Sequence, residues 1–286
     1  MKIRRPTQAG AFYAGSQQSL REQIESCFKH ELGPGSLPKV ADKKLQNVVG
    51  LVCPHAGYMY SGPVAAHGYH RLAEDGKPDV VVILGPNHTG SGSALAVMKE
   101  GIWQTPLGDV QIDSETAESI VHISNIVDID DLAHAFEHSI EVQLPFLQFL
   151  YGSSFKFVPI SFAIQDMQTS REVGLAVAKA LAGRNAVVIA STDMSHYEPQ
   201  KVVERKDKAV INATLKLDEE QVNSIVEAFD SDEKPMCGYG PTIAAVVSVK
   251  VLGAKKAELL CYKTSGDITG DYSAVVGYAS IAFMRS

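Results

Sequence analysis

Two short segments of the chain are apolar at every position. Residues 80–84 and 187–190 are all aliphatic, which is typical of β-strands that are buried on both faces rather than on one. Strands of this kind occur in sheets that are covered by helices on both sides. The two segments therefore favour an α/β fold with a central sheet.

Similar strand-like segments alternate with segments of helical periodicity along the chain. We expect strands at residues 48–53, 80–84, 95–98, 155–160, 187–190, 259–262 and 274–283. We expect helices at residues 18–30, 63–73, 114–122, 139–150, 171–181, 201–215, 219–228 and 241–251. This alternation predicts a single α/β domain over residues 1–286, in which a parallel or mixed sheet is flanked by helices.

Charge and hydropathy exclude several classes of partner. The chain carries 33 acidic and 26 basic residues, a formal net charge of −7, which opposes binding to nucleic-acid phosphates. No apolar run approaches the roughly 20 residues that cross a membrane, and the start lacks the apolar stretch of a signal peptide. We therefore expect a cytoplasmic protein with no nucleic-acid or membrane partner. Its four cysteines form no CxxC pair and are expected to be thiols.

Three histidines follow predicted strands within a few residues. His55 comes after the strand at 48–53, His88 after 80–84, and His196 after 187–190. Ligands of open α/β sheets bind beyond the carboxyl ends of the strands. A single histidine is more often a core or surface residue than a ligand, so it is the shared position that favours a common site.

Cys237 precedes the helix expected at residues 241–251, in which Pro241 suits the first helical position. The helix dipole favours negative charge at this end and so favours the thiolate, the form of cysteine that binds metals. A buried structural cysteine is the alternative interpretation.

A competing motif spans His134 to His138. The sequence His-Ala-Phe-Glu-His matches the HxxEH signature of inverted zinc proteases. Ser139, however, is a good N-cap for the helix expected at 139–150. That helix start leaves His134 in a loop, so we do not expect His134 and His138 to share a metal ion.

Six short motifs are spread over nearly the whole chain. They are RPxxAGxFY at 5–13, PHAGYxYSG at 54–62, GPNH at 85–88, EHSxExQLPF at 137–146, SxDMSHY at 191–197 and CG at 237–238. In this order and spacing they resemble the Memo family. In prokaryotes that family is the middle component of the AmmeMemoRadiSam gene trio.

The resemblance implies a fold similar to the class III extradiol dioxygenases, non-haem iron enzymes that cleave catechol rings. By position, His55 and His88 resemble the two histidine ligands of Fe(II), and Cys237 falls where a carboxylate ligand is expected. His196 resembles the acid–base histidine. A thiolate shifts metal preference toward copper, zinc or more softly bound iron. We expect Fe(II), with copper as the first alternative and zinc as the second.

Further residues take roles if the protein is such an enzyme. Asp193 is grouped with His196 as catalytic, and either Asp193 or Glu141 is expected to orient a histidine. A solvated or helix-end carboxylate is the alternative interpretation of each. The residues expected to line the substrate pocket are Tyr58, Tyr60, His138, Glu141 and Tyr197.

Three functions remain open at this level. The first is an extradiol-type dioxygenase acting on a small, catechol-like aromatic substrate. The second is a copper- or iron-binding redox or adaptor protein with a protein partner, since animal Memo proteins are associated with receptor-driven cell motility. The third is a metal-free peptide-binding module. The first two require the same ligands, so the sequence leaves enzymatic activity undecided.

Overall fold

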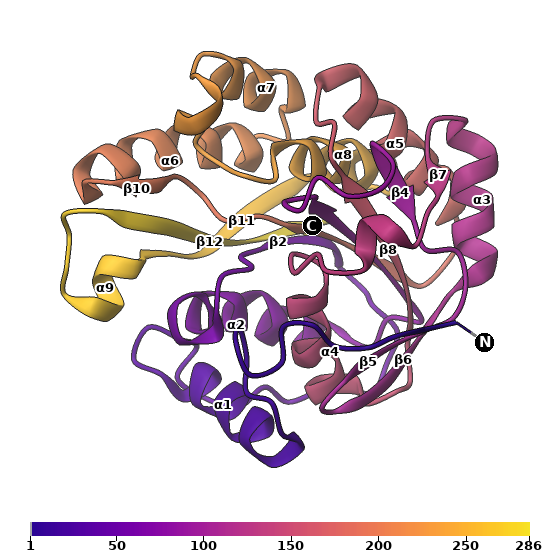
Figure 1. The fold of residues 1–286 in the computed structure, drawn as a ribbon, viewed down its shortest axis with the longest axis horizontal. Coiled ribbons are helices and arrows are strands. Elements are labelled where there is room, and N and C mark those ends of the chain that lie inside the picture. Colours follow the sequence, from indigo (N-terminus) through magenta and orange to yellow (C-terminus); the bar gives the residue numbers. More distant parts are fainter. Residues whose placement is uncertain (1) are drawn as a thin grey trace.

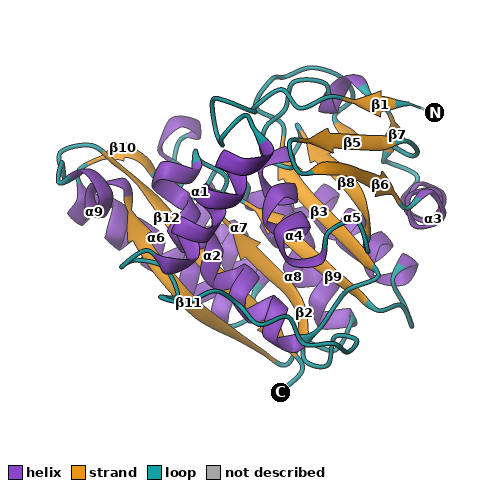
Figure 2. Ribbon diagram, turned by 90° about the horizontal axis from the view of Figure 1, so that it is seen from below, coloured by secondary structure: helices purple, strands orange, loops and turns teal. Residues whose placement is uncertain are grey.

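The two all-aliphatic segments lie side by side in a 12-stranded sheet in the computed structural model, which describes residues 2–286. Strand β3 (Val80–Pro86) is buried along its whole length. Strand β9 (Ala186–Ser191) runs parallel to it, with Val82 opposite Val188. Helices cover both faces of the sheet (Figures 1 and 2), as strands without a polar face require. The predicted α/β class is confirmed.

The inner strands all end on the same side of the sheet, and three of them precede His55, His88 and His196. The order along the sheet is β1 (Ile3–Arg4), β5 (Ile102–Thr105), β6 (Gly108–Ile112), β8 (Lys156–Phe162), β3, β9, β2 (Val48–Cys53), β12 (Val275–Met284) and β10 (His196–Glu198). The inner strands β6, β8, β3, β9 and β2 are parallel, whereas β12 is antiparallel to β2. Three further strands pair off this path: β11 (Lys256–Thr264) with β12, and β4 (Leu95–Val97) with β8 and β7 (Asp128–Ile129).

The helices form two layers (Figure 1). One layer contains α1 (Gln17–Lys29), α2 (Tyr58–Asp75) and α4 (Leu144–Tyr151). The other contains α3 (Ser114–Ser124), α5 (Met167–Ala180), α6 (Gln200–Leu215), α7 (Glu219–Glu227) and α8 (Tyr239–Val251). The short helix α9 (Ser265–Thr269) joins β11 to β12. No helix among residues 2–286 is long and apolar enough to cross a membrane.

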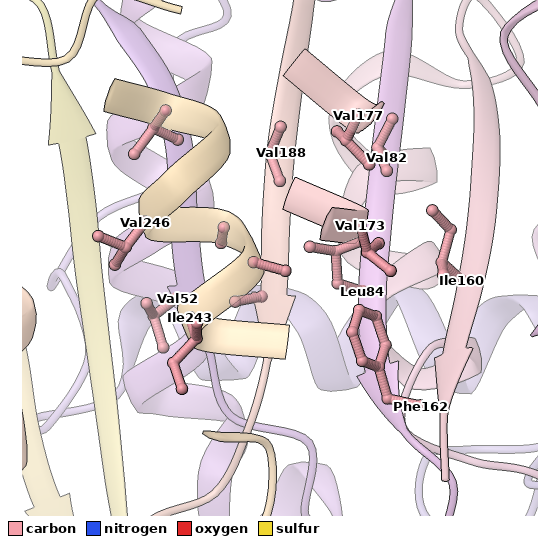
Figure 3. Packing of buried hydrophobic residues seen from close by; sticks show 14 of the residues in the cluster. Val52, Val82, Leu84, Ile160, Phe162, Val173, Val177, Val188, Ile243 and Val246 are labelled. Atoms are coloured by element: carbon pink, nitrogen blue, oxygen red, sulfur yellow. The ribbon is translucent and has the colours of Figure 1, made fainter. Parts of the chain in front are cut away.

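Helices α5 and α8 pack on the sheet and against each other. Figure 3 shows Ile243 and Val246 of α8 and Val173 of α5 among the side chains of the central strands. A Cβ atom at Gly174 would lie only 2.6 Å from the carbonyl oxygen of Ala244. The two helices therefore approach this closely because residue 174 has no side chain.

Every predicted strand is present, but four predicted helix starts are wrong. Helix α5 begins at Met167 rather than at residue 171. Helix α2 begins at Tyr58 rather than at residue 63, which places Pro63 inside it. Helix α8 begins at Tyr239, so Pro241 is its third residue. The helix predicted from residue 139 begins instead as a 3₁₀ turn at Glu141–Gln143 and becomes α4 at Leu144.

Ser139 does not cap a helix. Its Oγ donates a hydrogen bond to the carbonyl oxygen of Pro86 at 2.8 Å, so the side chain ties this segment to the end of β3. His134 ends a 3₁₀ turn, Leu132–His134, rather than lying in an open loop. Long-range contacts with the sheet thus override the local capping preference of serine.

Candidate metal centre

His55, His88 and Cys237 meet at the carboxyl edge of the sheet. His55 follows β2, His88 follows β3, and Cys237 precedes α8. Nε2 of His55 lies 3.2 Å from Sγ of Cys237. One ligand atom from each of the three residues lies within 4.8 Å of the other two. The structure therefore brings together two imidazoles and one thiol that are distant in sequence.

The ring of His55 is buried, and its tautomer follows from its hydrogen bonds. Nδ1 lies 2.9 Å from Oγ of Ser191. That hydroxyl already donates to the carbonyl oxygen of Ser139 at 2.6 Å and accepts from Nε2 of Gln143 at 2.8 Å. Ser191 must therefore accept from His55, which places the ring proton on Nδ1 and leaves the lone pair of Nε2 directed toward Cys237.

Burial and the neighbouring His88, His138 and His196 lower the pKa of His55 well below its usual value. The ring is consequently neutral at neutral pH. A neutral imidazole with a free Nε2 lone pair is the form that binds a metal ion.

His88 is oriented by a buried carboxylate. Its Nδ1 lies 3.0 Å from Oε1 of Glu137. The same oxygen accepts the backbone N–H groups of His138 at 2.9 Å and Ser139 at 2.8 Å. Burial would raise the pKa of Glu137, but the hydrogen bond and charge of His88 and the N–H of Ser139 lower it to about 2. An ionised carboxylate only accepts, so Nδ1 of His88 carries a proton and Nε2 is the atom that can bind a metal ion once its own proton is released.

Cys237 reaches the histidines because the next residue is glycine. A Cβ atom at Gly238 would lie 2.6 Å from the carbonyl oxygen of Ser191, so a side chain there would push the loop away from β9. The backbone N–H of Asp193 points at Sγ of Cys237 from 3.3 Å. Gly238 is the N-cap of α8. The sulfur therefore lies beside a backbone N–H donor and close to the N-terminus of α8.

His196 and Asp193 lie beside this cluster. A cavity of about 650 Å³ is lined by both of them, together with His55 and His88. Burial, and then the charge of His88, lowers the pKa of His196. Oδ1 of Asp193 accepts the backbone N–H groups of His55 at 2.7 Å and Ala56 at 3.3 Å. Asp193 therefore holds the backbone of the His55 loop and does not contact an imidazole through that oxygen.

The carboxylate that orients a histidine is Glu137, to which the sequence analysis gave no role. Glu141 was a candidate for that role, but it is fully buried elsewhere. It pairs with Nη1 of Arg4 at 2.6 Å and accepts the hydroxyl of Tyr13 at 2.5 Å. Burial raises the pKa of Asp193, the other candidate, to about 6. The sequence signal for Glu137 was its place beside His138 in the HxxEH and EHSxExQLPF motifs.

The expected pocket residues divide into two groups. Tyr60, His138 and Tyr197 line the cavity, with the ring of His138 stacked on that of His88 at a centroid distance of 4.5 Å. Tyr58 and Glu141 are absent from its lining among residues 2–286. Tyr58 instead donates its hydroxyl proton to the carbonyl oxygen of Val142 at 2.6 Å.

A second cluster of possible metal ligands shares His88. It consists of His88, Glu137 and His138, and His134 belongs to neither cluster among residues 2–286. The ring of His134 is buried and packs edge-on against Trp103 at a centroid distance of 5.7 Å. The HxxEH segment therefore does not present its two histidines on one helical face.

Comparisons with known proteins agree with the motif pattern. The family described as Memo-like protein matches residues 4–282. A MEMO1 family protein of Methanopyrus kandleri is 55% identical over 284 residues, 99% of either chain. One of Methanothermobacter thermautotrophicus is 49% identical over 98% of this chain and 100% of its own.

A crystal structure of an uncharacterized protein, JW3007 of Escherichia coli K12, is similar in fold. Its TM-score is 0.55 at 14% sequence identity, and the match covers 82% of this chain and 99% of that one. At this identity the likeness concerns the fold alone. The match over residues 4–282 and the archaeal relatives decide the family: the chain belongs to the Memo family.

Proposed function

We propose that the protein binds one transition-metal ion through His55, His88 and Cys237 and uses it to cleave a catechol-type ring with O₂. The observation that carries this proposal is the engagement of both Nδ1 atoms, one by Ser191 and one by Glu137. Both Nε2 atoms are thereby left for a ligand next to a thiol. Preorganised imidazoles with polar partners behind them are characteristic of metal sites.

The donor distances fit a single ion. Metal–nitrogen bonds of about 2.1 Å and metal–sulfur bonds of about 2.3 Å place neighbouring donors roughly 3–4 Å apart. The separation of 3.2 Å between His55 Nε2 and Cys237 Sγ lies in this range. Two imidazoles and a thiolate suit Fe(II), copper or zinc. We favour Fe(II), which, when bound, would supply a redox-active centre for the diol and for O₂.

The side chains around this centre provide the remaining chemistry. His196 lines the same cavity, and its lowered pKa keeps the ring neutral at neutral pH. A neutral imidazole can accept a phenolic proton from the substrate and later return it. Asp193 fixes the loop that carries His55. The cavity volume of about 650 Å³ is in the range of small-molecule sites.

A second candidate function keeps the metal without turnover. It is favoured by the thiolate of Cys237, which O₂ can oxidise and which also suits copper. The protein would then sequester copper or iron, or act as a redox adaptor for a protein partner. Either function fits a reducing compartment, and we propose that the protein is cytoplasmic.

The test is anaerobic reconstitution with Fe(II) followed by an oxygen-uptake screen against substituted catechols. We expect oxygen uptake that depends on both iron and catechol, together with the absorbance of a ring-opened product. Absence of uptake with every catechol at full iron occupancy would favour the non-catalytic function. Failure to retain any transition metal would refute both.

A further inference from the structure

We propose that the outer part of the cavity is a subsite for an organic cation, and that the ligand carries a protonated amine. The catechol half of that ligand rests on the proposed function, whereas the cation subsite rests on the cavity lining alone.

The lining is uneven in charge. Besides four histidines, its ionisable side chains are two carboxylates, Asp193 and Asp271, and three phenols; no lysine or arginine lines it among residues 2–286. A ligand carboxylate or phosphate at the outer end would face Asp271 without a lysine or arginine to balance it. An ammonium group would be attracted there, and the net charge of −7 favours the approach of cations.

Asp271 supplies the fixed negative charge. It lies on the exposed segment between α9 and β12 and lines the cavity. Oδ1 accepts hydrogen bonds from the N–H of Ser273 at 2.9 Å and its hydroxyl at 2.6 Å, which lower the pKa of Asp271. No lysine, arginine or histidine forms an ion pair with it among residues 2–286. The carboxylate is therefore ionised and available to a ligand.

Three tyrosines contribute aromatic rings to the lining of the cavity. Tyr60, Tyr197 and Tyr278 line the cavity. Tyr278 is only 2% exposed, and its hydroxyl has no hydrogen-bond partner among residues 2–286. Burial, and then Asp193, Tyr197 and Tyr60, raise its pKa, so the group stays a neutral phenol. The hydroxyl of this largely buried side chain, which lines the cavity, is therefore free to bond to a ligand.

Tyr197 places an aromatic ring at the mouth of the cavity. Its backbone has φ of 59°, the left-handed region that bulky residues rarely adopt. The side chain gains little from burial there, because 77% of the residue is exposed. Such a conformation persists where the surroundings impose it, commonly at functional sites. Aromatic faces attract ammonium groups, especially beside a carboxylate.

The two ends of the site are formed by different segments. The histidine end contains the buried His55 and the exposed His88, whereas Asp271 lies on the exposed segment between α9 and β12. A small aromatic ligand can place its diol at the histidines and its amine between Tyr197 and Asp271. The volume of about 650 Å³ suits such a molecule.

The test compares probes of one shape and different charge by calorimetry on anaerobic Fe(II)-loaded protein. The first series is dopamine, ethylcatechol and dihydrocaffeate. The second is tyramine, ethylphenol and hydroxyphenylpropionate, which lack the second hydroxyl and cannot chelate the metal. We expect the amine to bind about tenfold more tightly than the neutral probe, and the carboxylate most weakly, in both series. The preference should decrease at high salt.

Two substitutions locate the effect. Asp271→Asn should remove most of the preference for the amine while leaving ethylcatechol affinity unchanged. Asp109→Asn, at an exposed carboxylate of β6 outside the cavity lining, should change neither. Equal or tighter binding of the carboxylate probes in both series would overturn the cation subsite, even if ethylcatechol is turned over. The phenol series can show the amine binding most tightly and the carboxylate most weakly while no catechol binds the metal. That result would support the cation subsite and refute the proposed dioxygenase function.

Discussion

Nδ1 of His88 and Oε1 of Glu137 lie 3.0 Å apart, although the two residues are 49 positions apart in sequence. Glu137 is 1% exposed, so the carboxylate is shielded from water behind the imidazole. Its second oxygen accepts the backbone N–H of His88. This carboxylate–histidine pair fixes the ring so that Nε2 faces the side on which Cys237 lies.

Replacing Glu137 with Gln should therefore weaken metal binding. The amide keeps the shape of the side chain but loses the charge that holds His88, and loss of such a partner typically costs about 10–100-fold in metal affinity. Competition with a chelator of known affinity measures the effect. Glu118→Gln, at an exposed carboxylate paired with Lys99, is the matched control. Equal affinities for both variants and the wild type would show that Glu137 does not support the site.

Metal affinity should rise with pH. Burial would lower the pKa of His88, but hydrogen bonds to Cys237 and Glu137 raise it to about 10 in the metal-free protein. A metal ion must displace that proton, so affinity should increase and protons should be released between about pH 6 and about pH 9. Calorimetric titration in buffers of different ionisation enthalpy counts the protons. A pH-independent affinity without proton release would contradict this assignment.

The same pair sets a pH window for the stability of the metal-free protein. The pKa of His88 is raised from 6.5 to about 10 in the folded protein. Its contribution to the free energy of unfolding is therefore complete below pH 6.5 and is lost as pH rises through about 10. The pKa of Glu137 is lowered from 4.5, so its contribution is present above pH 4.5 and is lost as pH falls through about 2. Both contributions coincide between pH 4.5 and 6.5. Denaturant titrations of wild type and Glu137→Gln at pH values from about 2 to about 10 measure this. The difference in unfolding free energy should be greatest between pH 4.5 and 6.5.

His196→Ala should separate catalysis from metal binding. His196 lines the cavity but belongs to neither ligand cluster among residues 2–286. Its loss should reduce oxygen uptake by about 10²–10⁴-fold with iron content nearly unchanged. His122→Ala, at an exposed position in α3, serves as the control. Loss of iron in His196→Ala would identify His196 as a ligand instead.

The buried pair of Arg4 and Glu141 should be important for stability. Their side chains are 5% and 0% exposed and lie 2.6 Å apart. Arg4→Met leaves Glu141 buried without its cation, which typically costs about 3–5 kcal/mol. Lys2→Met breaks the exposed ion pair with Asp131 and should have a much smaller effect. Equilibrium denaturation of both variants tests this, and equal destabilisation would refute it.

Strands and histidine positions were predictable because their signals are local. The all-aliphatic segment at residues 80–84 marks a doubly covered strand, and His88 follows it closely. The hairpin of β5 and β6 was missed because its strands mix polar and apolar residues, as in Gly108–Ile112. The roles of Glu137 and Glu141 were not predictable, because their partners His88 and Arg4 are reached only through the tertiary fold.

The predicted helix starts were wrong for a related reason. Ser139 is a good N-cap by composition, yet its hydroxyl bonds to Pro86 at the end of β3. Tyr58 begins α2 although Pro63 is the stronger local start signal. The start of α2 is held instead by the backbone N–H of Tyr58, which donates to the carbonyl oxygen of Phe12 at 2.8 Å. In both segments, partners distant in sequence decide where the helix begins.

X-ray absorption at the iron edge of anaerobic Fe(II)-loaded protein tests the central claim most directly. The proposed ligands predict one sulfur at about 2.3 Å from the metal, together with nitrogen or oxygen donors at about 2.1 Å. The sulfur should disappear in Cys237→Ser and persist in Cys261→Ser, a half-buried thiol elsewhere in the fold. A first shell of wild-type protein with only nitrogen and oxygen at full iron occupancy would contradict the assignment of His55, His88 and Cys237 as the ligands.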